Sequence, residues 1–171
     1  PEILDEHIVK CKAATNKPFA VNLPLLYPDI DKHIENIIKH EVPIVFTSAG
    51  SPKKWTSTLK KHGIKVVHVV SSAMFAAKSE TAGVDALVCE GFEAGGHNGR
   101  DETTTMCLIP AVVDAVNIPV IAAGGLHDGK SMLAAMVLGA EGVQMGSRFV
   151  VTQESSAHID FKNTVVGLDE G

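Results

Sequence analysis

Residues 87–100 read Leu-Val-Cys-Glu-Gly-Phe-Glu-Ala-Gly-Gly-His-Asn-Gly-Arg, an apolar run that changes into a glycine-rich, polar loop. Such a run is typical of the end of a buried strand, and the loop after it is typical of an active site. Glycines allow positive φ angles and a close approach of the backbone to a ligand. His97 carries the one side chain of this loop that exchanges a proton near neutral pH. We therefore interpret the rest of the chain as the frame that presents this loop.

The same change from apolar run to polar loop recurs along the chain. Strands are predicted at residues 19–23, 43–47, 66–70, 86–89, 119–123 and 142–145. Helical spacing of apolar residues predicts helices near 1–11, 29–38, 52–59, 74–82, 108–116, 133–137 and 154–166, with Asp29 placed to cap the second. Strands that alternate with helices in this way are typical of a parallel sheet covered by helices. The strands are continuous apolar runs, as expected when both faces of a sheet are buried.

The loops rich in glycine and hydroxyl residues lie after the carboxyl ends of the strands, whereas the connections from each helix to the next strand carry no such cluster. This asymmetry favours an α/β fold of the (β/α)8 TIM-barrel type, in which ligands bind at the carboxyl ends of the strands. About six βα units, corresponding to strands 3 to 8, are present, so two strands are expected before Pro1. We expect residues 1–171 to be a single TIM-barrel domain that is incomplete at both ends.

Composition excludes several classes of protein. The chain has 171 residues, 45% of them hydrophobic, with a mean hydropathy of +0.16, a net charge of −5 and a pI near 5.9, which indicates a globular protein without a basic stripe for nucleic acid. Cys11, Cys89 and Cys107 lie far apart, which disfavours disulfides and a metal site and favours a reducing, cytoplasmic location. No apolar run is long enough to cross a membrane. We expect a small-molecule partner and neither nucleic acid nor membrane, with a homodimer as the open alternative to a monomer.

Two glycine-rich turns follow the last two predicted strands. They contain Gly124-Gly125 and Gln144-Met145-Gly146-Ser147. Barrels build their phosphate sites from the loops after strands 7 and 8, where backbone N–H groups bind phosphate without a basic side chain. The alternative is that these glycines only permit tight turns. Neither turn matches the dinucleotide or Walker A fingerprint.

Three further polar residues lie near the predicted mouth of the barrel. Asn22, at the end of its strand, is predicted to hydrogen-bond a ligand, although Asn-Leu-Pro is also a common turn sequence. Glu90 and Glu93 are predicted either to pair with His97 and bind a ligand or to be solvated loop acids. His68, within an apolar strand, is interpreted as a packed core histidine.

Three motifs together resemble the nitronate monooxygenase (2-nitropropane dioxygenase) family, which includes enoyl-acyl-carrier-protein reductase II. They are Glu-Gly-Phe-Glu-Ala-Gly-Gly-His-Asn-Gly at 90–99, Val-Ile-Ala-Ala-Gly-Gly at 120–125 and Gly-Ala-Glu-Gly-Val-Gln-Met-Gly-Ser-Arg-Phe at 139–149. Three positions depart from the family pattern: Ala20 stands where Gly is usual, Glu90 where Gln is common, and Ser147 where Thr is usual. Serine keeps the hydroxyl of threonine, whereas a carboxylate at position 90 would alter the electronics of a flavin.

The resemblance implies an FMN-dependent TIM-barrel oxidoreductase, with His97 as its catalytic residue. The residues that it implies for FMN binding are Asn22, Glu90, Gly95, Gly124, Gly125, Gln144, Met145, Gly146 and Ser147. Oxidation of alkyl nitronates by molecular oxygen is slightly favoured. The first alternative is an enoyl-acyl-carrier-protein reductase of fatty-acid synthesis with NAD(P)H as co-substrate, because the run Thr103-Thr104-Thr105-Met106 resembles that branch of the family. The second alternative is a non-catalytic module that binds flavin or phosphate.

Overall fold

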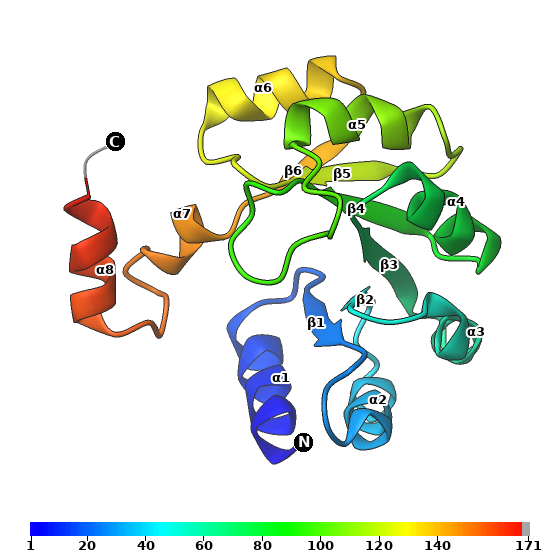
Figure 1. Ribbon diagram of the computed structural model, residues 1–171. Helices are drawn as coiled ribbons and strands as arrows, with labels where there is room; N and C mark the ends of the chain where they lie inside the picture. Colours follow the sequence, from blue (N-terminus) through cyan, green and yellow to red (C-terminus); the bar gives the residue numbers. More distant parts are fainter. Residues whose placement is uncertain (169–171) are drawn as a thin grey trace.

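The computed structural model describes residues 1–168 (Figure 1). Its strands are β1 (Ala20–Pro24), β2 (Ile44–Ser48), β3 (Lys65–Val70), β4 (Ala86–Glu90), β5 (Val120–Ala123) and β6 (Gly142–Gln144). Its helices are α1 (Glu2–Ala14), α2 (Ile30–Lys39), the 3-10 turn η1 (Pro52–Lys54), α3 (Thr56–Lys61), α4 (Ala73–Thr81), α5 (Thr105–Val113), α6 (Gly129–Val137), α7 (Ser147–Val150) and α8 (Ile159–Val166). The predicted strands therefore all form, with ends that differ by at most one residue.

The six strands form one parallel sheet in the order β1-β2-β3-β4-β5-β6. Each strand pairs with the next along the chain; Val45 lies opposite Val66, and Glu90 lies opposite Ala123. Figure 1 shows the sheet curling while α2 to α6 cover its outer side. Sequential order, parallel pairing and curling are the construction of a (β/α) barrel wall.

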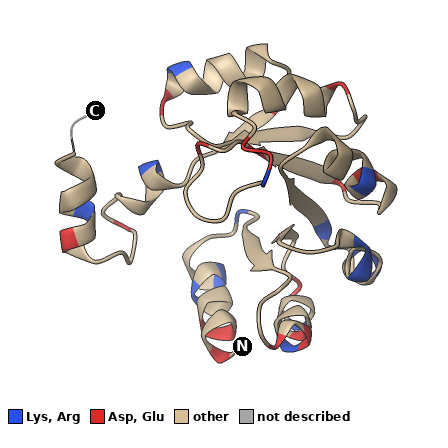
Figure 2. Ribbon diagram, viewed as in Figure 1, with Lys and Arg blue, Asp and Glu red and all other residues tan. Residues whose placement is uncertain are grey.

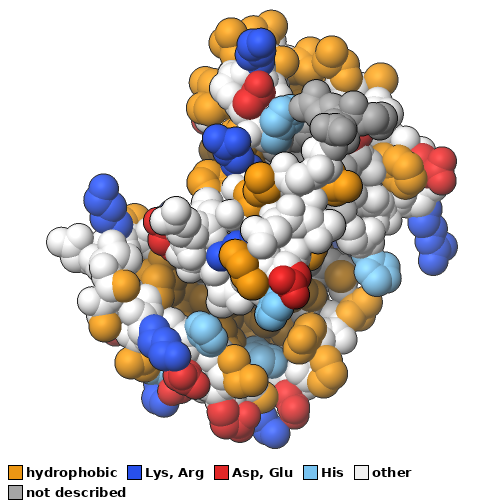
Figure 3. Space-filling view, turned by 90° about the vertical axis from the view of Figure 1, so that its left-hand side faces the viewer, with side chains coloured by type: hydrophobic (Ala, Val, Ile, Leu, Met, Phe, Trp, Pro, Cys, Tyr) orange, Lys and Arg blue, Asp and Glu red, His pale blue; other side chains and the backbone are white. Residues whose placement is uncertain are grey.

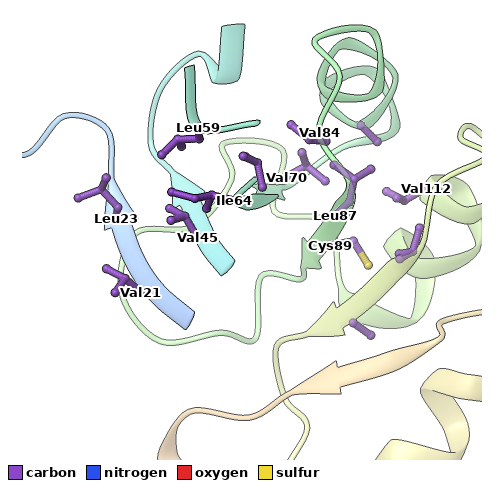
Figure 4. Packing of buried hydrophobic residues seen from close by; sticks show 14 of the residues in the cluster. Val21, Leu23, Val45, Leu59, Ile64, Val70, Val84, Leu87, Cys89 and Val112 are labelled. Atoms are coloured by element: carbon purple, nitrogen blue, oxygen red, sulfur yellow. The ribbon is translucent and has the colours of Figure 1, made fainter. Parts of the chain in front are cut away.

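Alternation along the strands separates two apolar layers. The outer layer packs the sheet against the helices, and Val45, Leu87 and Val112 in it are fully buried (Figure 4). The inner face carries a smaller cluster of Val67, Val88 and Ala123, with partly buried neighbours such as Phe46 and Val69. The outer layer thus holds most of the buried core, and the inner face turns toward the barrel interior.

Side-chain caps explain where two helices begin. Asp128 forms a capping box at the start of α6, because its carboxylate accepts from the backbone N–H of Ser131 at 2.8 Å and the Ser131 hydroxyl accepts from the N–H of Asp128 at 3.0 Å. Ser72 caps α4 by accepting from the N–H of Phe75 at 3.3 Å. Both caps follow strand ends and fix the direction in which the chain leaves the mouth of the barrel.

Two local predictions were wrong. Asp29 precedes α2 with a φ of 56° and makes no side-chain cap; its carboxylate instead contacts the Lys32 ammonium at 3.1 Å. The last helix begins at Ile159, with His158 as its cap, because Lys162 donates from Nζ to the carbonyls of Thr152 and Ser155 and holds the preceding residues in turns. Figure 1 shows α7 and α8 lying to one side of the sheet.

The first helix is attached to the barrel through α2. His40 Nε2 and Lys39 Nζ lie 2.7 and 3.0 Å from the same carboxylate oxygen of Asp5, and the Asn36 amide donates to the carbonyl of Pro1 at 2.9 Å. These contacts hold α1 against α2, and Ile8 of α1 is buried in the outer apolar layer. Within residues 1–168, no helix combines the length and the apolar character needed to cross a membrane.

Candidate active site

The carboxyl ends of the strands surround a hollow of about 980 Å³. This volume lies at the upper end of the range that small-molecule and cofactor sites occupy. Figure 3 shows a face of the molecule that is hollowed, with hydrophobic side chains inside and histidine side chains near the edge. Seven of the ten predicted site residues line the hollow: Asn22, Glu90, Gly95, His97, Gln144, Met145 and Gly146. The structure therefore brings together residues from both edge strands of the sheet, β1 and β6.

Gly124, Gly125 and Ser147 do not line this hollow. Gly124 has a φ of +101°, and a Cβ there would lie 2.8 Å from the Gly91 carbonyl oxygen and 2.9 Å from the Thr105 hydroxyl. Gly125 has a φ of +64°. The turn itself thus requires glycine at both positions, in agreement with the alternative that these glycines permit a tight turn. Ser147 is the first residue of α7 and is exposed.

The loop after β4, residues 91–104, is held in place by its own contacts. The Asn98 amide donates to the carbonyls of Phe92 and Ala94 at 3.0 and 2.9 Å. Gly99 lies so close to Ser71, at the end of β3, that a Cβ would come within 2.5 Å of the Ser71 Cβ. The loop therefore reaches from β4 across to β3 and forms one wall of the hollow.

Glu93 fastens the same loop to α5. Its carboxylate accepts from the backbone N–H of Thr105 at 2.8 Å and from the Thr105 hydroxyl at 2.9 Å. Burial raises the pKa of Glu93, but hydrogen bonds from its own backbone and from Thr105 outweigh burial, so the pKa lies below its usual value. The prediction that Glu93 is free to pair with His97 or with a ligand was wrong, because these bonds hold its carboxylate.

His97 itself is exposed at the edge of the hollow. Its ring forms no hydrogen bond or ion pair with another side chain or backbone group within residues 1–168. Both ring nitrogens therefore remain available to a ligand. Its backbone position is set by Asn98 and Gly99, which follow it directly in the chain.

Glu90 ends β4 with its side chain half-buried on the inner face. Burial raises the pKa of this carboxyl. It lies opposite Ala123 of β5, and Ala123 in turn lies opposite Gln144 of β6. The protonated form, favoured over a wider pH range than usual, is a hydrogen-bond donor, as the amide of glutamine would be. The neutral acid thus offers a ligand the donor that the common residue of the family pattern offers.

Several lining residues were not predicted. Ser48 and Ser71 end or follow β2 and β3, and Phe46 lies on the inner face of β2. Their position immediately at the carboxyl ends of strands was the available signal. His68 is buried and packed, as predicted, with Nδ1 2.7 Å from the Thr47 hydroxyl. Burial lowers the pKa of His68 to about 4.

The turns after β5 and β6 fit a phosphate group. The backbone N–H groups of Gly124, Gly125 and Gly146 donate to no backbone carbonyl within residues 1–168. Unpaired N–H groups in adjacent glycine turns are the usual cradle for a phosphate. The donors present therefore fit a phosphate group, and Gly146 among them lines the hollow together with Asn22, Glu90 and Gln144. In the part of the chain described, no three His, Cys, Asp or Glu side chains gather to hold a metal ion.

Comparison with known proteins gives concordant results. The family model described as nitronate monooxygenase matches residues 27–168. A probable nitronate monooxygenase of Staphylococcus aureus (strain Newman) is 42% identical over 147 residues, which cover 81% of this chain and 41% of that protein. A (3aS,4S,5R,7aS)-5-hydroxy-7a-methyl-1-oxo-octahydro-1H-indene-4-carboxyl-CoA dehydrogenase of Rhodococcus jostii (strain RHA1) is 40% identical over 153 residues, covering 90% of this chain and 43% of that protein.

Among solved structures, FabK from Thermotoga maritima superimposes with a TM-score of 0.93 and 46% identity. The match covers 97% of this chain and 53% of FabK. The likeness confirms the predicted (β/α)8 barrel type of fold. The chain spans about half the length of FabK and less than half that of the two curated relatives.

Proposed function

This chain belongs to the nitronate monooxygenase family, and on that premise we propose that it acts in an FMN-dependent oxidoreductase with His97 as the catalytic residue. The family and the relatives named above are oxidoreductases. One observation carries the proposal: His97, Glu90 and the turn at Gln144–Gly146 line a single hollow. The substrate of the complete enzyme is also proposed, in the form of the two candidate reactions below.

FMN, when bound, supplies the two-electron exchange that none of the side chains of this site can supply. The chain's own residues supply positioning and proton transfer. The N–H groups of Gly124, Gly125 and Gly146 bind phosphate, and Asn22 and Gln144 offer hydrogen bonds at the rim. The free ring of His97 takes up or delivers the proton at the reacting carbon, or hydrogen-bonds the negative charge of the substrate.

Nitronate oxidation is the first candidate reaction. A nitronate is a small anion that has already lost the proton at its reactive carbon, so it needs a hydrogen-bond donor for its oxygens. His97 meets this need, because its ring nitrogens are unpaired within the described residues, and the same ring would be the base that removes the proton from a neutral nitroalkane. The 42% identity with the Staphylococcus aureus protein supports this substrate class.

Reduction or oxidation of an acyl thioester is the second candidate, and two specific observations favour it. FabK, an enoyl-acyl-carrier-protein reductase II, is 46% identical, and the Rhodococcus relative acts on a carboxyl-CoA. The run Thr103–Met106 begins α5, and Thr105 in it holds Glu93 and thereby the loop of His97. The resemblance at residues 103–106 thus lies in a segment that positions the catalytic loop.

The purified full-length protein tests the proposal through its colour. We expect a yellow protein, or one that gains flavin absorbance when FMN is added. Anaerobic mixing then separates the candidates: bleaching by a nitronate but not by NAD(P)H supports the first, and bleaching by NAD(P)H followed by reoxidation with crotonyl-CoA supports the second. Flavin that neither compound bleaches would leave a binding module, and a colourless protein that binds no FMN would refute the flavin proposal.

A further inference from the structure

A second hollow lies on the outer side of the sheet, between the loop after β2 and α4. It has a volume of about 840 Å³ and is bounded by residues 49–53, by the end of β3 and by α4. In Figure 1 this region lies beside α4, at the carboxyl end of β3. A groove of this volume is large enough for a small-molecule ligand.

The floor of this groove holds a polar group with a free hydrogen-bonding site. His68 is only 5% exposed, and its Nδ1 lies 2.7 Å from the Thr47 hydroxyl. Its Nε2 forms no hydrogen bond within residues 1–168, and the ring lines the groove. This nitrogen is not among the buried polar atoms that lack a partner, so it is accessible from the groove. The groove therefore presents a neutral hydrogen-bonding group at its base.

The rim of the groove is basic on a protein that is acidic as a whole. Residues 42–79 contain six lysines and no aspartate or glutamate, whereas the complete chain has 20 acidic and 15 basic residues. Figure 2 shows basic residues on α3, α4 and the start of β3, but Lys60 and Lys65 pair with Asp85 at 3.1 and 3.5 Å and do not line the groove. Lys53 and Lys78 line the groove itself. A concentration of positive charge beside a hollow favours an anionic ligand.

The groove also has an aromatic surface. Phe75 of α4 lines it and is 47% exposed, with Lys78 Nζ 5.7 Å from the ring centroid. An exposed ring beside the Lys78 ammonium group, in a groove that Lys53 also lines, suits a ligand that joins a flat apolar ring to phosphate groups.

The groove is continuous with the candidate active site. Ala49, Val69, Val70 and Ser71 line both hollows. Ser71 is also the residue against which Gly99 of the catalytic loop packs. A long ligand can therefore lie in the groove at one end and reach the neighbourhood of His97 at the other.

From these observations we propose that the groove between the loop 49–53 and α4 binds the adenosine diphosphate part of a long co-substrate whose reactive end enters the mouth of the barrel. Coenzyme A thioesters and NAD(P)H share this part, so the proposal rests on the proposed oxidoreductase function and names the recognition site for either source. Lys53 and Lys78 bind the phosphates, Phe75 contacts the adenine, and His68 hydrogen-bonds from the floor.

Titration of the full-length protein with ADP tests the site directly. Trp55 is the one tryptophan of the chain and follows Lys53 and Lys54 directly, so its fluorescence reports on binding, with calorimetry as a second measurement. We expect Lys53→Ala and Lys78→Ala each to weaken ADP binding by about fivefold, and the double variant by about 25-fold, because each removes one charged contact with phosphate. Lys130→Ala, at an exposed lysine of α6, is the matched control and leaves binding unchanged.

FMN titration of the same variants separates this groove from the turns that fit the flavin phosphate. We expect FMN affinity to be unchanged in Lys53→Ala and Lys78→Ala. Absence of ADP binding, or ADP binding that these two substitutions leave intact, would overturn the proposal. ADP binding at the groove in a protein without flavin would instead refute the proposed function and leave the groove site standing.

Competition identifies the source of the ligand. Coenzyme A that displaces ADP supports a thioester substrate, and NADH or NADPH that displaces it supports a nicotinamide co-substrate. If neither coenzyme A nor a nicotinamide dinucleotide displaces ADP, the groove does not serve a co-substrate and the proposal fails.

Discussion

The Glu93 carboxylate accepts a hydrogen bond of 2.8 Å from the backbone N–H of Thr105, the first residue of α5, and another of 2.9 Å from its hydroxyl. One side chain thus satisfies an unpaired helix N–H and fixes the loop that carries His97. The two residues stand 12 positions apart, so this contact closes the loop at its base.

Glu93→Ala is expected to lower the free energy of unfolding by about 1–2 kcal/mol, because the N–H of Thr105 loses a charged acceptor, whereas its hydroxyl keeps the Gly124 carbonyl 2.9 Å away. Glu93→Gln, which keeps one acceptor oxygen, is expected to lose about half as much. Urea unfolding and the rate of proteolysis within residues 91–104 measure the two effects. Glu154→Ala, at an exposed acid, is the control. Equal stability of Glu93→Ala and Glu154→Ala would show that the contact does not hold the loop.

The same contact makes stability depend on acidity. The pKa of Glu93 is lower in the folded chain than its ordinary value of 4.5, so its stabilising effect is complete above that pH. The effect is lost as the pH falls through the lowered pKa and the carboxylate takes up a proton. Unfolding curves at pH 6 and pH 3 are expected to differ less for Glu93→Gln than for the unaltered protein.

Gly124→Ala is expected to destabilise the protein by at least about 2 kcal/mol, because the new Cβ would press on the Gly91 carbonyl at a positive φ. Gly142→Ala is the matched control, since a Cβ there has no heavy atom within 4 Å and its φ is not positive. Thermal unfolding compares the two. A Gly124→Ala variant as stable as Gly142→Ala would refute the close packing of this turn.

His68 predicts a second, separate dependence on pH. Its pKa is about 4 in the folded chain against an ordinary value of 6.5, because burial disfavours the charged ring. The unfolded chain therefore binds the proton first, and stability falls as the pH drops from 6.5 toward 4, by at most about 3 kcal/mol. His68→Gln is expected to flatten this part of the stability curve. An equally steep curve in His68→Gln would assign the effect to other groups.

Glu90→Gln tests whether the neutral form of this acid contacts the flavin. A carboxylate would repel the phosphate and the electron-rich ring of the cofactor, so FMN binding is expected to weaken as the pH rises through the raised pKa of Glu90. Glutamine stays neutral and is expected to keep FMN binding constant over that range. Flavin fluorescence titrations at several pH values measure it. The same pH dependence in both proteins would place Glu90 away from the flavin.

His97→Ala is expected to retain FMN but to lose at least about a hundredfold in turnover, because proton transfer contributes about that much. Its exposure predicts an unchanged free energy of unfolding. His62→Ala, at an exposed histidine between α3 and β3, is the control and is expected to leave turnover unaltered. Unchanged turnover in His97→Ala would remove this residue from the chemistry.

The sequence predicted the order and type of the βα units because each strand is a continuous apolar run with a polar loop after it. It could not predict which of two local interactions a side chain makes: Asp29 occupies a capping position but contacts Lys32. It also could not predict contacts between distant residues. The hydrogen bonds of Glu93 with Thr105 and the packing of Gly99 on Ser71 depend on how the loop lies in space.

The candidate site was predicted from strand ends, and the hollow contains most of the residues named, while their roles in binding and catalysis stay predictions. Asn22 and Gln144 were placed together correctly because all parallel strands of a barrel end at the same mouth. The distance between a loop and the helix of the next unit has no comparable signal in the sequence. The groove between the loop 49–53 and α4 could therefore be recognised only from the structure.

The sequential order β1 to β6 also has a consequence for how the protein matures. Each unit can dock on the one made just before it, so the wall can grow while the chain leaves the ribosome. The hollow, however, takes Asn22 from the first of these strands and Gln144 from the last. Ligand binding there is consequently postponed until the wall has curled, and retention of the cofactor becomes a measure of completed folding.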